Sequence, residues 1–228
     1  PVFHDDQHGT AIVVLAALKN SLKLVKKDIS TVKIVMSGAG AAGTAVARLL
    51  VKSGAKNIIA FDKDGAINAS RSREDEMRAW FIDHSNPTNF AGDIHEAMSG
   101  ADVFIGVSAP NVLTEADIAS MGAKSIVFAL ANPDPEIDPA IARKYAAVVA
   151  TGRSDQPNQI NNVLAFPGIF RGLLDANAHK ISDQMLMAAA EAIADCVSPD
   201  QLNASFIVPS VFDPNVVKAV AAAVKKSV

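Results

Sequence analysis

Short apolar runs and longer amphipathic segments alternate along most of the chain. Five of the runs are rich in valine, isoleucine and alanine, and we predict a strand for each of them. The expected strands cover residues 33–37, 57–61, 103–107, 125–130 and 147–150. Runs of this kind, without polar alternation, are typical of a parallel sheet that is covered on both faces.

The segments between and after these runs have their apolar residues at helical spacing. In the first of them Ile12, Leu15, Leu18 and Leu22 recur at intervals of three or four, and lysines follow where they favour the helix dipole. The expected helices cover residues 9–27, 42–53, 71–84, 93–98, 169–176, 182–196 and 214–226. Strands that alternate with helices predict an α/β fold with a right-handed, doubly wound parallel sheet.

The composition fits one domain of this class. Half of the 228 residues are hydrophobic and 5% are aromatic, and a chain of this length forms a core without disulfides or structural metal. The single cysteine, Cys196, lies in an apolar run and is expected to be a buried thiol. A net charge of −3 argues against nucleic acid as a partner. With no signal peptide or membrane-spanning run, we expect no membrane partner and a cytoplasmic enzyme.

A glycine-rich turn links the first strand to the helix after it. Gly38-Ala39-Gly40-Ala41-Ala42-Gly43 fits the pattern G-x-G-x-x-G, which is weak alone but specific between a strand and a helix. Gly38 permits the tight turn, Gly40 lets a pyrophosphate approach the backbone, and Gly43 lets helix and strand pack closely. The turn predicts a Rossmann-like dinucleotide site with phosphates at the helix start.

Polar residues follow the predicted strands. Asp62 stands 22 residues beyond Gly40 at the end of the second strand, where it is expected to accept hydrogen bonds from the adenine ribose. Ser108 and Asn132 end two later strands and are expected to border the nicotinamide and substrate. An ordinary exposed turn remains the alternative for Asp62, and an Asx turn for Asn132.

Two adjacent carboxylates, Asp5 and Asp6, precede the first long helix. They fit a helix cap or a metal site. As a metal site they are only one part, because a hard divalent cation binds about six oxygen ligands. The amide cluster at residues 158–162 suits either a site for a carboxylate or a polar loop. These residues alone leave both alternatives open.

Taken together, these motifs resemble those of one family. VFHDDQHGTA, GAGAAG, ALANPDPE and PNQINNVLAFPG occur in the order found in malic enzymes, in particular the shorter bacterial type. The resemblance extends from residue 1 to about residue 220. It implies oxidative decarboxylation of (S)-malate to pyruvate with NAD or NADP and with Mn²⁺ or Mg²⁺.

The resemblance also implies roles for single residues. Asp6 matches the metal-ligating carboxylate and Asp5 a supporting acid, while Asn132 and Asn162 match the asparagines that hold malate or pyruvate. The backbone of residues 39–42 matches the dinucleotide contact. The acid at position 62 gives a slight preference for NAD, although the adjacent Lys63 is placed to pair with the 2′-phosphate of NADP.

The same resemblance implies that this chain holds only part of an active site. Residues 1–228 correspond to the NAD(P)-binding domain: a metal-ligand motif and leading helix at 1–30, a Rossmann core at 31–168 and C-terminal helices at 169–228. Two further metal carboxylates and the catalytic lysine and tyrosine of the family lie in an upstream domain. A homodimer is the family's usual assembly. The alternatives are a malolactic-type enzyme and a non-catalytic dinucleotide-sensing module.

Overall fold

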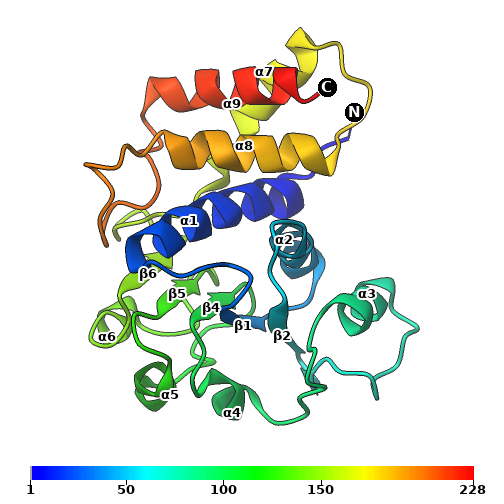
Figure 1. The fold of residues 1–228 in the computed structure, drawn as a ribbon, viewed down its shortest axis with the longest axis vertical. Helices are drawn as coiled ribbons and strands as arrows, with labels where there is room; N and C mark the ends of the chain where they lie inside the picture. The colour runs from blue at the N-terminus through cyan, green and yellow to red at the C-terminus, as the bar shows by residue number, and fades with distance from the viewer. Residues whose placement is uncertain (1) are drawn as a thin grey trace.

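The computed structural model describes residues 2–228, so Pro1 lies outside the described part. A central sheet is covered by helices on both faces, and a further group of helices is stacked on one side of this core (Figure 1). The six strands are ordered β3-β2-β1-β4-β5-β6. They are β1 (Lys33–Ser37), β2 (Asn57–Asp62), β3 (Gly65–Ala66), β4 (Val103–Gly106), β5 (Ile126–Ala129) and β6 (Val148–Thr151).

The sheet is parallel except at one edge, where the two-residue strand β3 pairs antiparallel with β2. Chain order reverses between β1 and β4, which are neighbours although two strands separate them in sequence. Such a switch point opens a crevice at the carboxyl ends of the strands, where ligands of open α/β sheets bind. The expected doubly wound α/β fold is therefore confirmed, with β3 as an unpredicted addition.

Alternation along the strands divides the core into two clusters. Ile34 and Met36 of β1 pack into one cluster, and Val35 between them packs into the other. The same alternation places Ile126 and Phe128 of β5 on one side of the sheet and Val127 on the opposite side. Because both faces are covered, β5 and the three central positions of β1 are apolar, as the uninterrupted runs in the sequence indicate.

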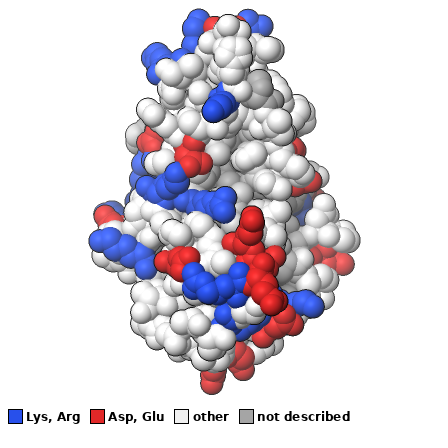
Figure 2. All heavy atoms as spheres, turned by 90° about the vertical axis from the view of Figure 1, so that its right-hand side faces the viewer, with Lys and Arg blue, Asp and Glu red and all other residues white. Residues whose placement is uncertain are grey.

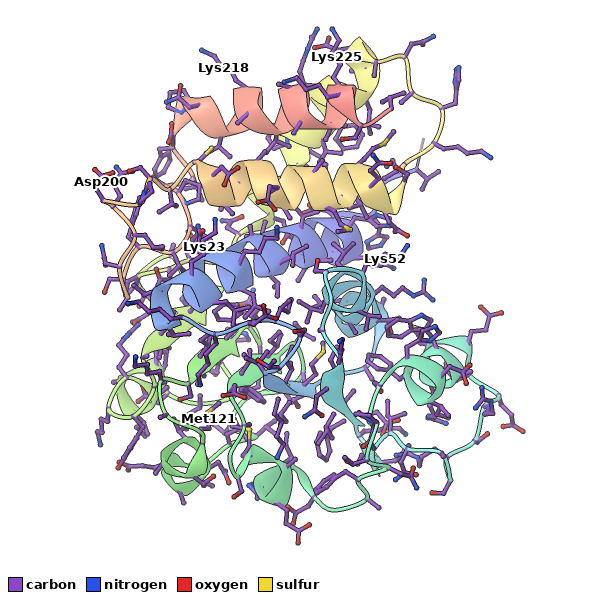
Figure 3. All side chains as sticks on the ribbon, in the orientation of Figure 1. Lys23, Lys52, Met121, Asp200, Lys218 and Lys225 are labelled. Atoms are coloured by element: carbon purple, nitrogen blue, oxygen red, sulfur yellow. The ribbon has the colours of Figure 1, made fainter. Side chains whose placement is uncertain are left out.

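The larger cluster lies under α1 (Thr10–Val25) and α2 (Ala41–Lys52). Helix α1 is almost entirely buried because it packs between the sheet and α8 (Asp183–Asp195) (Figure 1). The outermost layer is formed by α7 (Phe166–Asp175) and α9 (Pro214–Lys226), with Lys218 and Lys225 on the exposed side of α9 (Figure 3). A π-helical turn, η1 (Asp5–Gly9), leads into α1.

The opposite face of the sheet is covered by shorter helices. These are α4 (Ile94–Met98), α5 (Glu115–Ser120) and α6 (Pro139–Ala142). Helix α3 (Glu76–His84) lies beside α2, and a 3₁₀ turn, η2 (Asn162–Leu164), precedes α7. The sequence pattern predicted α4 but gave no signal for α5, α6 or η2, which are too short to show a periodic pattern.

The prediction of a helix over residues 71–84 is wrong for its first five residues. Helix α3 begins only at Glu76, because the side chain of Asp75 accepts a hydrogen bond from the backbone N–H of Arg78 and caps the helix there. The preceding residues form a loop beside β2. Cys196 is only half-buried, and not fully buried as expected.

The molecular surface is mixed in charge. Figure 2 shows Lys and Arg interleaved with Asp and Glu across the lower half of one face, at the height of α3 in Figure 1. Among residues 2–228, no helix is both long and apolar enough to cross a membrane.

Candidate functional site

A cavity of about 650 Å³ opens at the carboxyl ends of β4, β5 and β6. Its volume is in the range of small-molecule and cofactor sites. Segments distant in sequence meet there: η1, the start of α2, the three strand ends and η2. The lining residues are Asp5, Asp6, Thr10, Ala42, Val107, Ser108, Leu130, Ala131, Asn132, Gly152, Ile160, Asn161, Asn162, Val163 and Phe166.

The glycine turn closes one side of this cavity. Gly38 has φ +103°, and a Cβ there would lie 2.6 Å from the carbonyl oxygen of Val107, so only glycine fits without a shift. A Cβ at Gly43 would lie 1.9 Å from the carbonyl oxygen of Gly38. Nothing lies within 4 Å of a Cβ at Gly40, which precedes α2 and leaves the first N–H groups of the helix accessible.

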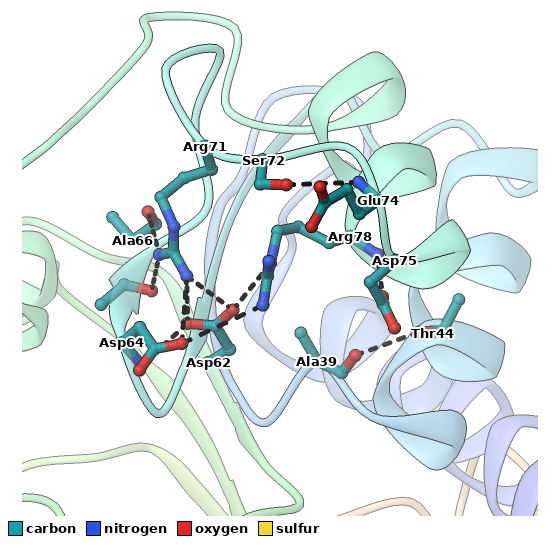
Figure 4. A network of polar contacts seen from close by, with 11 residues as sticks. Ala39, Thr44, Asp62, Asp64, Ala66, Arg71, Ser72, Glu74, Asp75 and Arg78 are labelled. Carbon is teal, nitrogen blue, oxygen red and sulfur yellow. Dashed lines mark hydrogen bonds and ion pairs between the residues drawn. The ribbon is translucent and has the colours of Figure 1, made fainter.

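Asp62 lies at the end of β2, where it is held by two arginines (Figure 4). Nη2 of Arg71 donates to both carboxylate oxygens at 2.9 Å, and Nε of Arg78 donates to Oδ2 at 3.3 Å. Arg71 is fixed further by the carbonyl oxygen of Ala66 at 3.1 Å. The sequence analysis missed both arginines, because they lie 9 and 16 residues from Asp62 in a loop and a helix whose packing no local pattern predicts.

These contacts determine the charge of Asp62. Burial alone raises the pKa of Asp62, but the hydrogen bonds from Arg71 and from the backbone of Asp64, together with both guanidinium charges, outweigh burial. The pKa is therefore below its ordinary value, and the carboxylate is ionised at neutral pH. An ionised carboxylate has about four lone-pair positions, and donors from Arg71, Arg78 and the backbone of Asp64 already make four contacts with them, so a ribose hydroxyl has to share or replace one of these donors.

Ser108 and Asn132, the residues expected to border the nicotinamide and substrate, both line the cavity and are exposed. The Ser108 hydroxyl is 2.8 Å from that of Ser37 at the end of β1. Asn132 precedes Pro133 through a cis peptide bond. Behind both residues lies the buried side chain of Glu136, the last residue of the motif ALANPDPE, to which the sequence analysis gave no role.

The acid pair and Asn162 meet across the cavity. The Asn162 side chain donates to the backbone oxygen of Asp5 at 3.2 Å and to Oδ2 of Asp5 at 3.4 Å, and it accepts from the hydroxyl of Thr10 at 3.2 Å. Asp6 is exposed and lines the same space. Residues about 155 positions apart therefore form one polar wall. Neither aspartate side chain accepts a capping hydrogen bond from a backbone N–H of η1.

The donor set fits part of a cation site. Oδ1 of Asp5 is buried and has no hydrogen-bond partner, which is costly for a carboxylate oxygen unless a cation or a donor from outside contacts it. Residues 2–228 contain no group of three or more His, Cys, Asp or Glu side chains arranged to hold a metal ion. Asp5 and Asp6 would thus supply only a fraction of the ligands of Mn²⁺ or Mg²⁺.

The remaining amides of residues 158–162 have structural partners. Asn158 is buried and donates to the carbonyl oxygens of Val149 and Ala204, while its Oδ1 accepts from the N–H of Ile207. The Asn161 side chain accepts from the N–H of Val163 and caps η2. Of this cluster, Asn161 and Asn162 line the cavity.

A strand, a glycine turn and a helix, followed by a fixed acid at the end of the next strand, define a dinucleotide-binding domain. The family model described as "Malic enzyme, NAD binding domain" matches residues 7–228. The chain therefore belongs to the malic enzyme family, as its NAD-binding domain.

Several curated proteins are similar to the chain. An NAD-dependent malic enzyme of Geobacillus stearothermophilus is 52% identical, over 98% of this chain and 47% of the relative. A bifunctional malic/malolactic enzyme of Bacillus subtilis is 50% identical, over all of this chain and 56% of the relative. An NADP-dependent malic enzyme of Rhizobium meliloti is 46% identical, over all of this chain and 32% of the relative.

Solved structures show the same relationship. The NAD-dependent malic enzyme of Thermotoga maritima superposes with a TM-score of 0.94 at 46% identity, over all of this chain and 60% of that protein. The Entamoeba histolytica malic enzyme gives 0.93 at 43% identity, over 99% and 48%. This chain thus spans between one third and three fifths of the length of these relatives.

Proposed function

We propose that this chain is the dinucleotide-binding part of an enzyme that oxidises and decarboxylates (S)-malate to pyruvate and CO₂ while reducing NAD or NADP. The supporting observation is the single cavity that joins the glycine turn, the strand ends and the Asp5–Asp6 pair. A sensor module needs the glycine turn but has no use for the acid pair. The names of the relatives support the same reaction.

In this proposal the two ends of the cavity have different tasks. The N–H groups at the start of α2 hold the pyrophosphate, and Asp62 accepts from the adenine ribose. The nicotinamide ring lies beside Ser108 and Asn132. Asn132 and Asn162 orient the substrate with neutral amides, which bind a carboxylate or carbonyl without adding a titrating charge.

The acid pair belongs to the metal side of the proposal. Asp6 would ligate Mn²⁺ or Mg²⁺ and Asp5 would support it, while an upstream domain of the same polypeptide adds the other ligands and the catalytic lysine and tyrosine. When bound, the metal supplies Lewis-acid polarisation of the substrate oxygens. A homodimer and a cytoplasmic location also remain part of the proposal.

The cofactor preference that we propose is for NAD. Asp62 is ionised and held in place, and a carboxylate at this position repels a 2′-phosphate. Both nearby guanidinium groups are already paired with Asp62. Lys63, which follows Asp62 directly, is in none of the ion pairs found among residues 2–228, and it supports some use of NADP.

The test of this function is Mn²⁺-dependent formation of reduced cofactor from (S)-malate by the full-length polypeptide that contains this chain. In that polypeptide Asp6→Asn should lower Mn²⁺ affinity and abolish most turnover, while NAD still binds. If Asp6 only capped a helix, asparagine would serve almost equally well and cost a few tenths of a kcal/mol. Normal Mn²⁺ dependence of the variant would remove Asp6 from the metal site.

The malolactic alternative is favoured by one relative, the bifunctional enzyme of Bacillus subtilis. It predicts lactate as product, with the cofactor returned to its oxidised form in each cycle. Analysis of the products from (S)-malate therefore separates the two reactions. Pyruvate with an equal amount of reduced cofactor supports the main proposal, and lactate without net reduction supports the alternative.

A further inference from the structure

A buried carboxylate lies directly behind the wall of the cavity. Glu136 follows β5 in the chain and its side chain has an exposed fraction of 0%. Oε1 accepts hydrogen bonds from the backbone N–H of Ser108 at 2.9 Å and from its hydroxyl at 3.3 Å, and Oε2 accepts from the N–H of Ala131 at 3.0 Å. Ser108 and Ala131 both line the cavity. Glu136 therefore lies one layer behind the surface that a ligand would contact.

The fold leaves space for this side chain. A Cβ on Gly106, the last residue of β4, would lie 2.3 Å from the carboxyl carbon of Glu136. The backbone oxygen of Glu136 also accepts a hydrogen bond from the N–H of Leu113 at 3.0 Å. The carboxylate thus connects the segments that follow β4 and β5, two neighbouring strands whose ends form the rim of the cavity.

The surroundings of Glu136 suit a negative charge. All three contacts of its carboxylate are with hydrogen-bond donors, whereas a protonated acid needs an acceptor for its own hydrogen. Burial raises the pKa of Glu136 above its ordinary value, and the N–H groups of Ala131 and Ser108 offset only part of this rise. None of the ion pairs found among residues 2–228 includes Glu136. A buried charge without a counter-ion is costly, so a positively charged ligand nearby would relieve it.

We propose that Glu136 is a positioning residue for the nicotinamide, and that its negative charge makes the cavity bind the oxidised, cationic ring more tightly than the neutral reduced ring. This inference rests on the proposed function, which puts the ring beside Ser108 and Asn132. Glu136 acts through the two residues it holds and through its field, which extends over several ångströms in a poorly solvated site. Weaker binding of the reduced ring favours release of the product cofactor.

The test measures the affinity of the chain for three probes, NAD⁺, NADH and ADP-ribose, which lacks the nicotinamide. Glu136→Gln keeps the size of the side chain and removes its charge. We expect affinity for NAD⁺ to fall roughly tenfold, affinity for NADH to fall less, and affinity for ADP-ribose to stay the same. Glu115→Gln is the matched control, because it removes one charge from the exposed surface of α5. It should leave all three affinities unchanged.

Other outcomes contradict the proposal. An equal loss of affinity for all three probes would show that Glu136 only supports the fold. Unchanged affinities would show that its charge does not act on the nicotinamide ring. If the glutamine variant does not fold, Glu136→Met fills the same volume without charge and is judged by the same ratio of NAD⁺ to NADH affinity. A failure of the proposed function gives a different result. In that case the wild-type chain binds dinucleotide but the full-length polypeptide does not oxidise malate, and the role of Glu136 is unaffected.

Discussion

Gly40 and Gly43 stand three residues apart in one turn, yet their surroundings differ. A side chain at Gly43 would meet backbone atoms, whereas one at Gly40 would meet none within 4 Å. The open space beside Gly40 is where the pyrophosphate would approach the first N–H groups of α2. The first position therefore matters for ligand binding and the second for folding.

We predict that Gly40→Val weakens dinucleotide binding roughly tenfold or more and leaves the melting temperature almost unchanged. Calorimetry and thermal unfolding of the chain check the two parts. Gly43→Ala is the matched control, expected to lower stability by about 1–3 kcal/mol because the added Cβ forces a shift of Gly38. Unchanged affinity in Gly40→Val would place the phosphates elsewhere.

Asp62 is the residue on which the cofactor preference depends. We predict that Asp62→Asn lowers affinity for NAD and raises affinity for NADP, changing their ratio roughly tenfold. Arg71 and Arg78 lose their nearer anionic partner, keep only Asp64 at 3.6 and 4.0 Å, and become more available to a phosphate. Binding constants for both cofactors check this. Asp83→Asn is the control: it removes a charge from the exposed part of α3, frees Arg73 in the preceding loop and should leave the ratio unchanged.

At the scale of elements, the loop between β3 and α3 is tied to the sheet by the Asp62–Arg71 and Asp62–Arg78 contacts. The pKa of Asp62 is lowered from 3.8, so its contribution to stability is complete above that pH and is lost as pH falls through the folded-state pKa. We predict that the protection factors of the backbone N–H groups in residues 63–78, which correct for the pH dependence of intrinsic hydrogen exchange, stay constant down to about pH 4 and fall below it. A loop already mobile at pH 6 would contradict this.

The loop before α3 and the start of this helix could not be predicted from the sequence pattern. The helix predicted from the apolar periodicity began at residue 71. This pattern contains no information on the contact of Arg71 with Asp62 or on the capping of the helix by Asp75. The long buried elements were predicted well, since their apolar spacing reflects the two-sided burial that α1 and the strands undergo. Glu136 lay beyond prediction, since its partners Ser108 and Ala131 come from two different strand ends.

At the scale of the whole molecule, the described residues form a complete core but an incomplete donor set for a metal. We predict that a polypeptide of these 228 residues alone binds dinucleotide and does not oxidise malate, because the proposed lysine, tyrosine and two metal ligands lie elsewhere. Calorimetry and a malate assay with Mn²⁺ check both parts. Steady turnover by the purified chain would show that the catalytic groups are within it.

Helix α1 has a mechanical consequence for the cavity. It is buried between the sheet and α8, and it packs against α2, so η1 at its start is attached to a closely packed part of the molecule. The Asp5–Asp6 pair and the glycine turn thus lie at the starts of two helices that pack against each other. The distance between the acid pair and the glycine turn is therefore set by helix packing and does not depend on a bound ligand. In the proposed full-length enzyme, we therefore expect a closing movement to come from the opposite wall of the cavity, with this domain as its fixed reference.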